Sequence, residues 1–367
     1  MLSKLKSTAP VEKLPTYFTY TDDELKSFKS LTSSQKITKE ELYFSDKTAF
    51  DLVILDKSTD VLASKVFAYL AVAQSDAANL SFNTHGKYLG NLSLLRKKIL
   101  CEFFPTRCTG IVIAGQEDEY SSKIAEIVMS KVNERIEIDD KQTKPYEQKI
   151  GKDYWNGSEP MIGREVGSWK TWAITSSDQF RAEENIPFNS PEFSKQLATT
   201  KTALKNITVE QRNAVIFWAG GPGTKTPPGL WLEIADEHMN QEKVSLEKVL
   251  QVRAILTVAM ADAFISCFDS KYSYWVKRPF MLDKTIQTVM PTPNHPSYPD
   301  GHATLSAAAA TILSYYFPEE KSTWESKSHE AADSRLWGGI HYPYDNEQGY
   351  LMGQKVGEAV LNKLVQK

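Results

Sequence analysis

The amino-acid sequence predicts an all-α protein, and three observations support this fold class. Apolar residues recur three and four positions apart over long segments; in residues 60–80 they include Val61, Val66, Phe67 and Leu70. This spacing is the period of an α-helix. The same segments are rich in strong helix formers. Alternating runs of β-branched residues, which are typical of strands, are scarce.

The helices are expected in a definite order along the chain. The sequence Thr-Asp-Asp-Glu, beginning at Thr21, is a capping signature that opens a first short helix. An alanine-rich helix is expected from His302 to Phe317, and Pro343 is well placed as the first residue of a C-terminal helix. In that last helix, glycines at four-residue spacing predict close packing. Between these points the apolar period predicts helices near residues 60–80, 91–104, 119–134, 191–204, 208–219, 229–239 and 245–268.

The chain of 367 residues is expected to form one domain after an irregular N-terminal arm over residues 1–20. The domain would span residues 21–367, with an N-terminal helical half at 21–205 and a C-terminal half at 206–367 that carries the site. Residues 138–190 are aromatic-rich and weakly periodic, so they are expected to cover the core or to wall a pocket. The Gly/Pro-rich residues 218–231 lack the order of a nucleotide P-loop and read as a crossover between helical layers.

Charge and hydropathy narrow the partners of the protein. The formal net charge is −3 and both signs are interspersed, without the basic face that nucleic-acid binding requires. The longest apolar stretch, residues 254–268, is interrupted by Asp262 and is shorter than the roughly 20 residues that span a bilayer, so a buried helix is expected. No signal-peptide core is seen at the N-terminus. The sequence does not decide whether the protein is cytoplasmic or is periplasmic or secreted. A homo-oligomer is possible as well.

Three cysteines are present, and they form no CxxC pair, which argues against a zinc site. Because cysteine prefers buried positions, three free thiols in the core are expected. The alternative is a disulfide between Cys101 and Cys108 in an oxidising compartment, which would leave Cys267 single and buried.

Three blocks in the last quarter of the chain hold its most informative polar residues: residues 269–279, 295–302 and 334–345. From separate segments they supply three cations, histidines and a carboxylate. Fixed cations around a histidine can hold a tetrahedral or trigonal-bipyramidal oxyanion. The blocks therefore predict an enzyme built on an oxyanion site.

In the first block, Lys271 and Arg278 are seven residues apart, or two helical turns, so both are expected on one helix face. Pro279 is expected to end that helix. Two such cations can form a solvated stripe. The aromatic neighbours Tyr272 and Trp275 instead indicate a partly buried face, where a cation needs an anion.

The second block places Asp300, Gly301 and His302 at the start of the alanine-rich helix. A helix N-terminus with a bare glycine amide is a ready anion site. Asp300 is equally well explained as an ordinary N-cap of this helix. His302 could likewise be only a surface residue at a helix start.

In the third block, two glycines separate Arg335 from His341, and Asp345 follows His341 by four residues. Asp345 can accept a hydrogen bond from Nδ1 of His341, which fixes the tautomer and leaves Nε2 free as a ligand or nucleophile. A lone histidine is more often structural. This one is accompanied by an orienting carboxylate and an upstream arginine.

The order of these motifs resembles the vanadium-dependent haloperoxidase and type 2 phosphatidic acid phosphatase superfamily. The matching motifs are Lys-x6-Arg-Pro from Lys271, Pro-x-Gly-His ending at His302, and Ser-Arg-x5-His-x3-Asp ending at Asp345. The resemblance is close over residues 269–349, and features upstream of it are similar to the soluble haloperoxidase branch. It implies a fold of helical bundles, often two related four-helix bundles.

The resemblance also implies a role for each site residue. His341 would bind vanadium at the apical position of vanadate, and His302 would be the acid–base group that assists peroxide binding. The implied activity is the oxidation of a halide by hydrogen peroxide with vanadate as cofactor. The oxygens of vanadate would be held by three side-chain cations and one main-chain amide, those of Lys271, Arg278, Arg335 and Gly301.

The same residues suit a soluble acid phosphatase that acts on a small phosphate ester. His341 would then attack phosphorus, and His302 would protonate the leaving alkoxide. Phosphate would occupy the place of vanadate. Because vanadate is similar to the five-coordinate transition state of phosphoryl transfer, one pocket can serve either chemistry.

Asp300 departs from the family, which usually has serine at this position. A serine hydroxyl donates a hydrogen bond to an oxyanion, whereas an ionised carboxylate can only accept one. Two unit charges ~4 Å apart cost about 4 kcal/mol at an effective dielectric near 20, or roughly a thousandfold in affinity. Three outcomes are open. Asp300 is protonated, it turns away to cap the helix or pair with a cation, or the chain is a non-catalytic member that has lost oxyanion affinity.

His295 is expected in the vicinity of the halide or substrate. Bromide- and iodide-oxidising relatives often carry a histidine there, and chloride oxidisers an aromatic residue. A plain turn histidine is the alternative.

Overall fold

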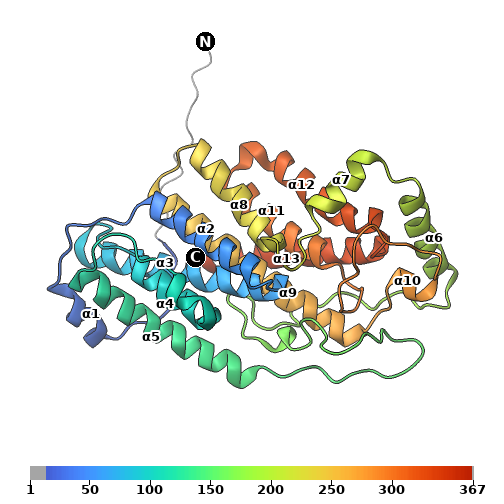
Figure 1. The fold of residues 1–367 in the computed structure, drawn as a ribbon, viewed down its shortest axis with the longest axis horizontal. Helices are drawn as coiled ribbons and strands as arrows, with labels where there is room; N and C mark the ends of the chain where they lie inside the picture. Colours follow the sequence, from blue (N-terminus) through green and yellow to red (C-terminus); the bar gives the residue numbers. More distant parts are fainter. Residues whose placement is uncertain (1–13, 366–367) are drawn as a thin grey trace, which may run out of the picture.

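The computed structural model describes residues 14–365, and within that range the chain forms helices and no strand, apart from an isolated bridge between Lys36 and Leu89. The all-α prediction is confirmed (Figure 1). Three short 3₁₀ helices, at Pro105–Gly110, Val166–Ser168 and Pro318–Glu320, interrupt the connections. The α-helices are α1 (Asp22–Lys29), α2 (Lys39–Leu55), α3 (Asp60–His85), α4 (Ser93–Phe103), α5 (Glu119–Gln142), α6 (Pro191–Lys205), α7 (Val209–Phe217), α8 (Thr226–Gln241), α9 (Leu246–Tyr274), α10 (Pro279–Leu282), α11 (Gly301–Tyr316), α12 (Lys321–Trp337) and α13 (Pro343–Leu364).

Many helices begin where a short polar side chain caps the first turn. Thr21 accepts from the amide of Glu24 and completes a capping box, as the sequence predicts, and Thr208 does the same with Gln211. Each such cap contributes about 1 kcal/mol to the stability of its helix. Further side-chain caps start α2, α3, α5, α6, α9 and α11, and they are Thr38, Thr59, Asp118, Ser190, Ser245 and Asp300.

The helices that periodicity predicts are present, but several run further than predicted. The helix expected at 245–268 extends to Tyr274, and the one expected at 119–134 extends to Gln142. Packing against neighbours carries these helices beyond their clearly periodic parts. Periodicity does not predict α2 or α12. Helix α12 is polar along most of its length, so its buried face leaves little signal in the sequence.

Helix α9 is the central element of the fold. It packs against α3 on one side and against α11 and α13 on the other. By length and composition, the segment Leu246–Leu282 could cross a membrane, but its most apolar window is 100% buried inside the protein. A helix that is apolar all round is the expected core of a large domain.

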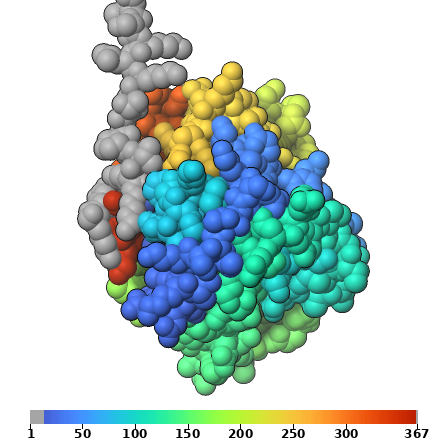
Figure 2. All heavy atoms as spheres, turned by 90° about the vertical axis from the view of Figure 1, so that its left-hand side faces the viewer, coloured from blue at the N-terminus to red at the C-terminus, as the bar shows by residue number. Residues whose placement is uncertain are grey.

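Early and later helices of the chain lie at opposite sides of the molecule, on either side of a central group (Figure 1). Helices α1 to α5 gather on the left of that view, and α6, α7 and α10 lie on the right. Seen from the left, the surface is made mainly of the N-terminal half, with α8 above it (Figure 2). One hydrophobic cluster runs through both halves, from Leu14 to Leu361. The division near residue 205 stays a prediction.

Carboxylates of α9 hold the irregular segment between α5 and α6. Asp262 accepts the main-chain N–H groups of Trp172, Ala173 and Ile174 at 2.7, 2.8 and 3.1 Å. Asp269 pairs with Arg181 at 2.7 Å. These contacts spread the aromatic-rich segment over the core, as its composition predicts.

Helices α11 and α13 pack at very short range because α13 carries glycines on the facing side. A Cβ atom at Gly349 would lie 2.5 Å from the carbonyl oxygen of Asp300, and one at Gly353 would lie 2.1 Å from that of Thr304. No side chain fits at these distances. The glycine spacing noted in the sequence therefore places the start of α11 directly against α13.

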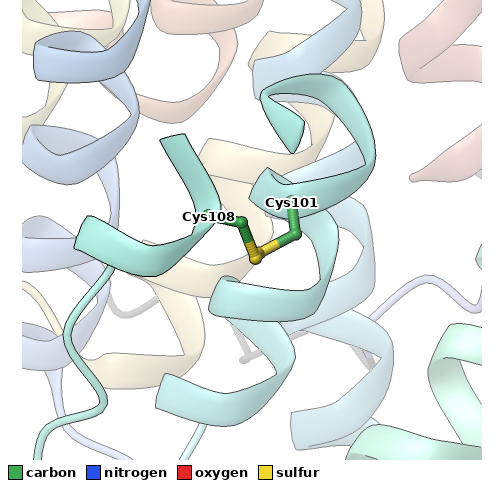
Figure 3. Close-up of a disulfide and its surroundings, with 2 residues drawn as sticks. All are labelled: Cys101 and Cys108. Carbon is green, nitrogen blue, oxygen red and sulfur yellow. A yellow bond between two sulfur atoms is a disulfide. The ribbon is translucent and has the colours of Figure 1, made fainter. Parts of the chain in front are cut away.

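Cys101 and Cys108 form a disulfide, so the expectation of three free thiols is wrong (Figure 3). Cys101 lies in the last turns of α4 and Cys108 in the 3₁₀ turn that follows, with the two Cα atoms 4.8 Å apart. Both are only partly buried, so the burial preference of cysteine does not apply to them. Cys267 is free and buried.

The N-terminal arm is described only from residue 14; its first 13 residues lie outside the described part. Asp76 of α3 holds the arm by accepting the main-chain N–H groups of Tyr17 and Phe18 at 3.0 and 2.9 Å. The hydroxyl of Tyr20 donates to the same carboxylate at 3.1 Å. Burial raises the pKa of Asp76 to about 7.

Candidate active site

The first block does not form a single helix face. Helix α9 ends at Tyr274 because the buried Trp275 takes a left-handed conformation with φ of 56°. Arg278 is the residue that precedes α10, and Pro279 begins that helix instead of ending α9. The prediction of one shared face is therefore wrong. Lys271 and Arg278 nevertheless converge, because both side chains are fully buried beside the second block.

Lys271 fixes the segment that leads to Asp300. Its Nζ donates to the carbonyl oxygens of Pro296, Ser297 and Pro299 at 3.0, 2.7 and 2.5 Å. Burial lowers the pKa of Lys271 to about 8. The ammonium group is thus held by neutral acceptors, and no carboxylate of the described residues pairs with it closely. Burying a charge in this way costs free energy.

Arg278 connects the second block to the third. Its Nη1 donates to the carbonyl oxygen of Ile340 at 2.9 Å and to Nε2 of His341 at 2.8 Å. Its Nε donates to the carbonyl oxygen of His295 at 3.2 Å, and its Nη2 lies 3.1 Å from Nδ1 of the same residue. Burial lowers the pKa of Arg278 to about 10.

His341 and Asp345 form the pair that their spacing predicts. Nδ1 of His341 lies 2.8 Å from Oδ2 of Asp345. Ser297 donates to the same oxygen at 2.5 Å, and burial raises the pKa of Asp345 to about 6. Sequence reasoning missed Ser297, although it stands inside the second block and a hydroxyl there was a signal. The pair leaves the lone pair of His341 on Nε2.

Nε2 of His341 is not free, contrary to the sequence-based expectation. Besides the guanidinium of Arg278, it faces Oδ1 of Asp300 at 3.2 Å. Burial, together with Arg278 and Lys271, holds the pKa of His341 well below its usual value, so the ring is neutral at neutral pH. The contact therefore joins a carboxyl oxygen to an unprotonated nitrogen, and it is not an ion pair.

Asp300 also caps α11, which is one of the outcomes that the sequence leaves open. Its carboxylate accepts the main-chain N–H groups of His302 and Ala303 at 3.0 and 3.2 Å. Burial raises the pKa of Asp300, although the nearby Lys271 and Arg335 oppose this shift. Asp300 does not turn away from the site, because the oxygen that accepts from His302 also faces His341.

Arg335 completes the set of three cations from the last turn of α12. Its Nη2 donates to the carbonyl oxygen of Val215 at 2.9 Å, and its Nε donates to the hydroxyl of Ser334 at 2.9 Å. The side chain is 1% exposed, and burial lowers its pKa to about 10. Arg335 therefore carries a positive charge without a close carboxylate partner among the described residues.

The remaining predicted site residues are His302, His295 and Gly301, and they lie next to the residues described above. His302 keeps some exposure, and its Nε2 lies 2.7 Å from the carbonyl oxygen of Trp218, so Nε2 carries the proton and Nδ1 the lone pair. Burial lowers the pKa of His302 well below its usual value. His295 is buried with its ring 5.2 Å from that of Phe268. Gly301 lies near Lys271, whose Cε would be 4.0 Å from a Cβ at that position.

The arrangement fits an oxyanion such as vanadate or phosphate. Three cations lie with the carboxylates of Asp300 and Asp345 around His341, Asp60 also acts on Lys271, and the imidazole of His341 presents an unprotonated nitrogen beside Arg278. Anion oxygens can take hydrogen bonds from Arg278 and Arg335, whereas Lys271, whose three N–H bonds already go to carbonyl oxygens, attracts the anion by its charge; Nε2 can bind the central atom. One feature opposes an anion, the carboxylate of Asp300 beside Nε2.

Sequence comparisons match parts of the chain to known proteins. A family model described as the VCPO second helical-bundle domain matches residues 320–367, which include Arg335, His341 and Asp345. The vanadium-dependent bromoperoxidase of Ascophyllum nodosum is 29% identical over 113 residues, covering 23% of this chain and 20% of that protein. The match thus spans about a fifth of the length of that relative.

Solved structures share the fold over most of the chain. A bacterial vanadium-dependent iodoperoxidase superposes with a TM-score of 0.75 at 21% identity, covering 91% of this chain and 98% of the other. A bacterial vanadium-dependent chloroperoxidase, in its apo form, superposes with a TM-score of 0.61 at 11% identity, covering 85% and 94%. At these identities the likeness establishes the fold.

Proposed function

We propose that this chain is a vanadate-dependent haloperoxidase that oxidises a halide with hydrogen peroxide, in line with its partial likeness to vanadium haloperoxidases in sequence and its likeness to them in fold. The observation that carries the proposal is that three buried cations surround the pair formed by His341 and Asp300. Arg278 contacts Nε2 of His341 directly, whereas Lys271 and Arg335 act on Asp300 beside it. A relative that shares part of the sequence is a vanadium-dependent bromoperoxidase.

Each residue has a role that its contacts support. Lys271, Arg278 and Arg335 neutralise the oxygens of the oxyanion, and the buried setting strengthens this attraction. His341 binds the central atom through Nε2, because Asp345 and Ser297 hold its proton on Nδ1. Vanadate, when bound, would supply the Lewis acidity that activates hydrogen peroxide toward halide.

His302 is suited to take a proton from hydrogen peroxide. Its Nε2–H is engaged by the carbonyl oxygen of Trp218, so the ring is held in place and Nδ1 carries the lone pair. A histidine with a lowered pKa stays neutral in mildly acidic solution and remains available as a base. His295 accepts from Arg278 through its carbonyl oxygen and is the residue proposed to lie in the vicinity of the halide.

The test is peroxide-dependent halide oxidation by protein that has been incubated with vanadate, at mildly acidic pH. We expect activity in the wild type and a loss of at least about a hundredfold in His341→Ala, since the nitrogen that binds the central atom is removed. Iodide, bromide and chloride are compared in parallel. Equal activity in the variant, or none in the wild type with any of the three halides, would contradict the proposal.

A soluble acid phosphatase is the second candidate, because the same contacts orient His341 as a nucleophile. Asp345 accepts the hydrogen bond of Nδ1, so the proton of the ring stays on that nitrogen and Nε2 keeps the lone pair needed for attack. The expected result is turnover of a small phosphomonoester that vanadate inhibits and that His341→Ala abolishes. Absence of turnover with several esters would count against this candidate.

The disulfide supports an oxidising compartment for the protein. Disulfides persist in periplasmic and secreted proteins and are rare in the cytosol. The Cys101–Cys108 bond is formed between partly exposed residues, where cytosolic reductants would reach it. We therefore propose a periplasmic or secreted location, which labelling of free thiols in protein from its native source can test.

A further inference from the structure

We propose that Asp300 determines the ligand specificity of the oxyanion site: its carboxylate admits an oxyanion that carries a hydroxyl group and rejects one that has no proton to donate. Hydrogenphosphate and hydrogenvanadate belong to the first class, and sulfate belongs to the second. The inference rests on the proposed oxyanion site and defines its ligand more closely.

The first step is the position of the carboxylate. Oδ1 of Asp300 lies 3.2 Å from Nε2 of His341, the atom on which the central atom of the ligand would be bound. Asp345 contacts the opposite ring nitrogen, Nδ1, and shares its oxygen with Ser297. Among the described residues, Asp300 is therefore the carboxylate that an oxyanion at Nε2 must meet.

The second step is that Asp300 is held in this position. Its side chain caps α11 through the amides of His302 and Ala303, and its own amide donates to the carbonyl oxygen of Asp345 at 2.9 Å. Its carbonyl oxygen accepts from the hydroxyl of Thr304 at 2.7 Å and packs against Gly349. Turning the carboxylate away would break the cap of a helix that is buried over most of its length.

The third step is the hydrogen-bonding chemistry of the pocket. The cations Lys271, Arg278 and Arg335 can only donate, so they bind any oxyanion of suitable size. The two main-chain N–H groups that Asp300 accepts favour its ionised form. An ionised carboxylate can only accept, so the oxygen that approaches Asp300 must bring a proton. Phosphate keeps at least one proton near neutral pH, whereas sulfate keeps none. A bare sulfate oxygen against Asp300 would place two negative acceptors in contact within a buried site.

The experiment is calorimetric titration of phosphate and of sulfate into the full chain, near neutral pH and without vanadate or peroxide. The two ions are similar in size and shape and differ in the proton. A site that pairs with a ligand hydroxyl discriminates strongly against an analogue that lacks it. We expect the wild type to bind phosphate more tightly than sulfate by a factor on the order of 10³.

The variant Asp300→Asn should reduce this preference to less than about tenfold, because the amide can donate to a bare oxygen. Asn and Ser are both good N-caps, so Asp300→Asn and Asp300→Ser keep the start of α11. Far-UV circular dichroism of each variant verifies the fold. Asp300→Ser serves as the second variant, with the same loss of preference expected.

The matched control is Asp118→Asn, which makes the same change at another helix N-cap. Asp118 caps α5 by accepting the amide of Ser121 at 2.7 Å, in the N-terminal half of the chain. This variant should leave the affinities for phosphate and sulfate unchanged. An equal loss of preference in the control would assign the effect to helix capping and would overturn the proposal.

Two other results would overturn it as well. One is a wild type that binds sulfate as tightly as phosphate. The other is a wild type that binds neither ion while Asp300→Asn binds both, because Asp300 would then exclude anions and not select among them. The proposed function fails separately: a protein that distinguishes phosphate from sulfate but never oxidises halide with vanadate loses the haloperoxidase assignment and keeps this inference.

Discussion

Helix α9 carries a buried cation near each end, and the two lie in opposite electrostatic settings. Near its beginning, Arg253 donates from Nε to Asp46 at 2.6 Å, pairs with the other oxygen of that carboxylate, and contacts Gln74. Near its end, Lys271 donates only to carbonyl oxygens and is close to Arg278. The first cluster has a carboxylate in direct contact with its cation, whereas the cations of the second have no carboxylate at ion-pair distance among the described residues.

The pKa shifts of the cations record this difference. Burial alone would lower the pKa of Arg253, but Asp46 and Asp236 outweigh it and raise the value. For Lys271, Arg278 and Arg335, burial prevails and the pKa falls. A raised pKa indicates that a buried cation is paired with a carboxylate of the protein. Lowered pKa values in a group of buried cations indicate a candidate site for binding an anion. The comparison therefore predicts different consequences for mutation in the two clusters.

The largest effect is expected at the structural cluster. Replacing Arg253 with leucine leaves Asp46 and Asp236 buried without their cation, which should lower the free energy of unfolding by about 3–5 kcal/mol. Urea denaturation of the wild type and the variant measures this loss. Phosphate affinity of the folded variant should not change. A variant as stable as the wild type would remove the contrast between the clusters.

The next effect is expected at the site. Arg335→Leu should weaken phosphate and vanadate binding by about 10²–10³-fold, because a charge-assisted contact is lost in a buried setting. Its free energy of unfolding should change by less than about 1.5 kcal/mol, since removing one cation relieves repulsion from Arg278. Calorimetry and urea denaturation of the same preparation give both quantities. If the variant lost stability but kept its affinity, Arg335 would have a structural role like that of Arg253, and the prediction would be wrong.

A smaller effect is expected where the N-terminal half is cross-linked. Replacing Cys101 and Cys108 with serine opens a loop with a sequence separation of 7, which should lower the free energy of unfolding by about 2 kcal/mol. Phosphate affinity should remain that of the wild type, because the bond joins α4 to the 3₁₀ turn after it, and neither element carries a residue of the proposed site. Thermal unfolding of both proteins with and without a reductant checks this. Reductant should affect only the wild type.

The smallest effect concerns Asp76, a buried carboxylate that is held by N–H and O–H donors without a cation. Its folded pKa of about 7 lies above the value near 4 of an unfolded chain, so its contribution to stability is full below pH 4 and is lost as the pH rises through 7. The wild type should therefore lose about 1–2 kcal/mol relative to Asp76→Asn between pH 5.5 and 7. Urea denaturation at several pH values measures the difference. A constant difference across this range would mean that Asp76 stays ionised.

The sequence predicts those parts of the site that depend on local spacing. His341 and Asp345 are four residues apart, and the turn into α13 brings them together as expected. Arg278 was harder to place, because nothing in the local pattern shows that Trp275 would leave the helix to become buried. The contact between Asp300 and His341 joins residues 41 positions apart, and it depends on the close packing of α11 on α13.

In the fold, too, the parts that depend on local sequence patterns are the ones that can be predicted. Helices with a clear apolar period, such as α3 and α11, are predictable because a single face or the whole surface is buried. Helix α12 is not, since most of its residues are polar and its packing is set by partners distant in the chain. The pairing of Cys101 with Cys108 depends on the turn after α4, which sequence alone left open.

The central claim is that Lys271, Arg278 and Arg335 together hold an oxyanion on His341. Crystals of the protein soaked with vanadate test it most directly. The account predicts vanadium density next to Nε2 of His341, with its oxygens directed at the three cations. Vanadate bound elsewhere, or density at this place that persists unchanged in His341→Ala, would contradict the account.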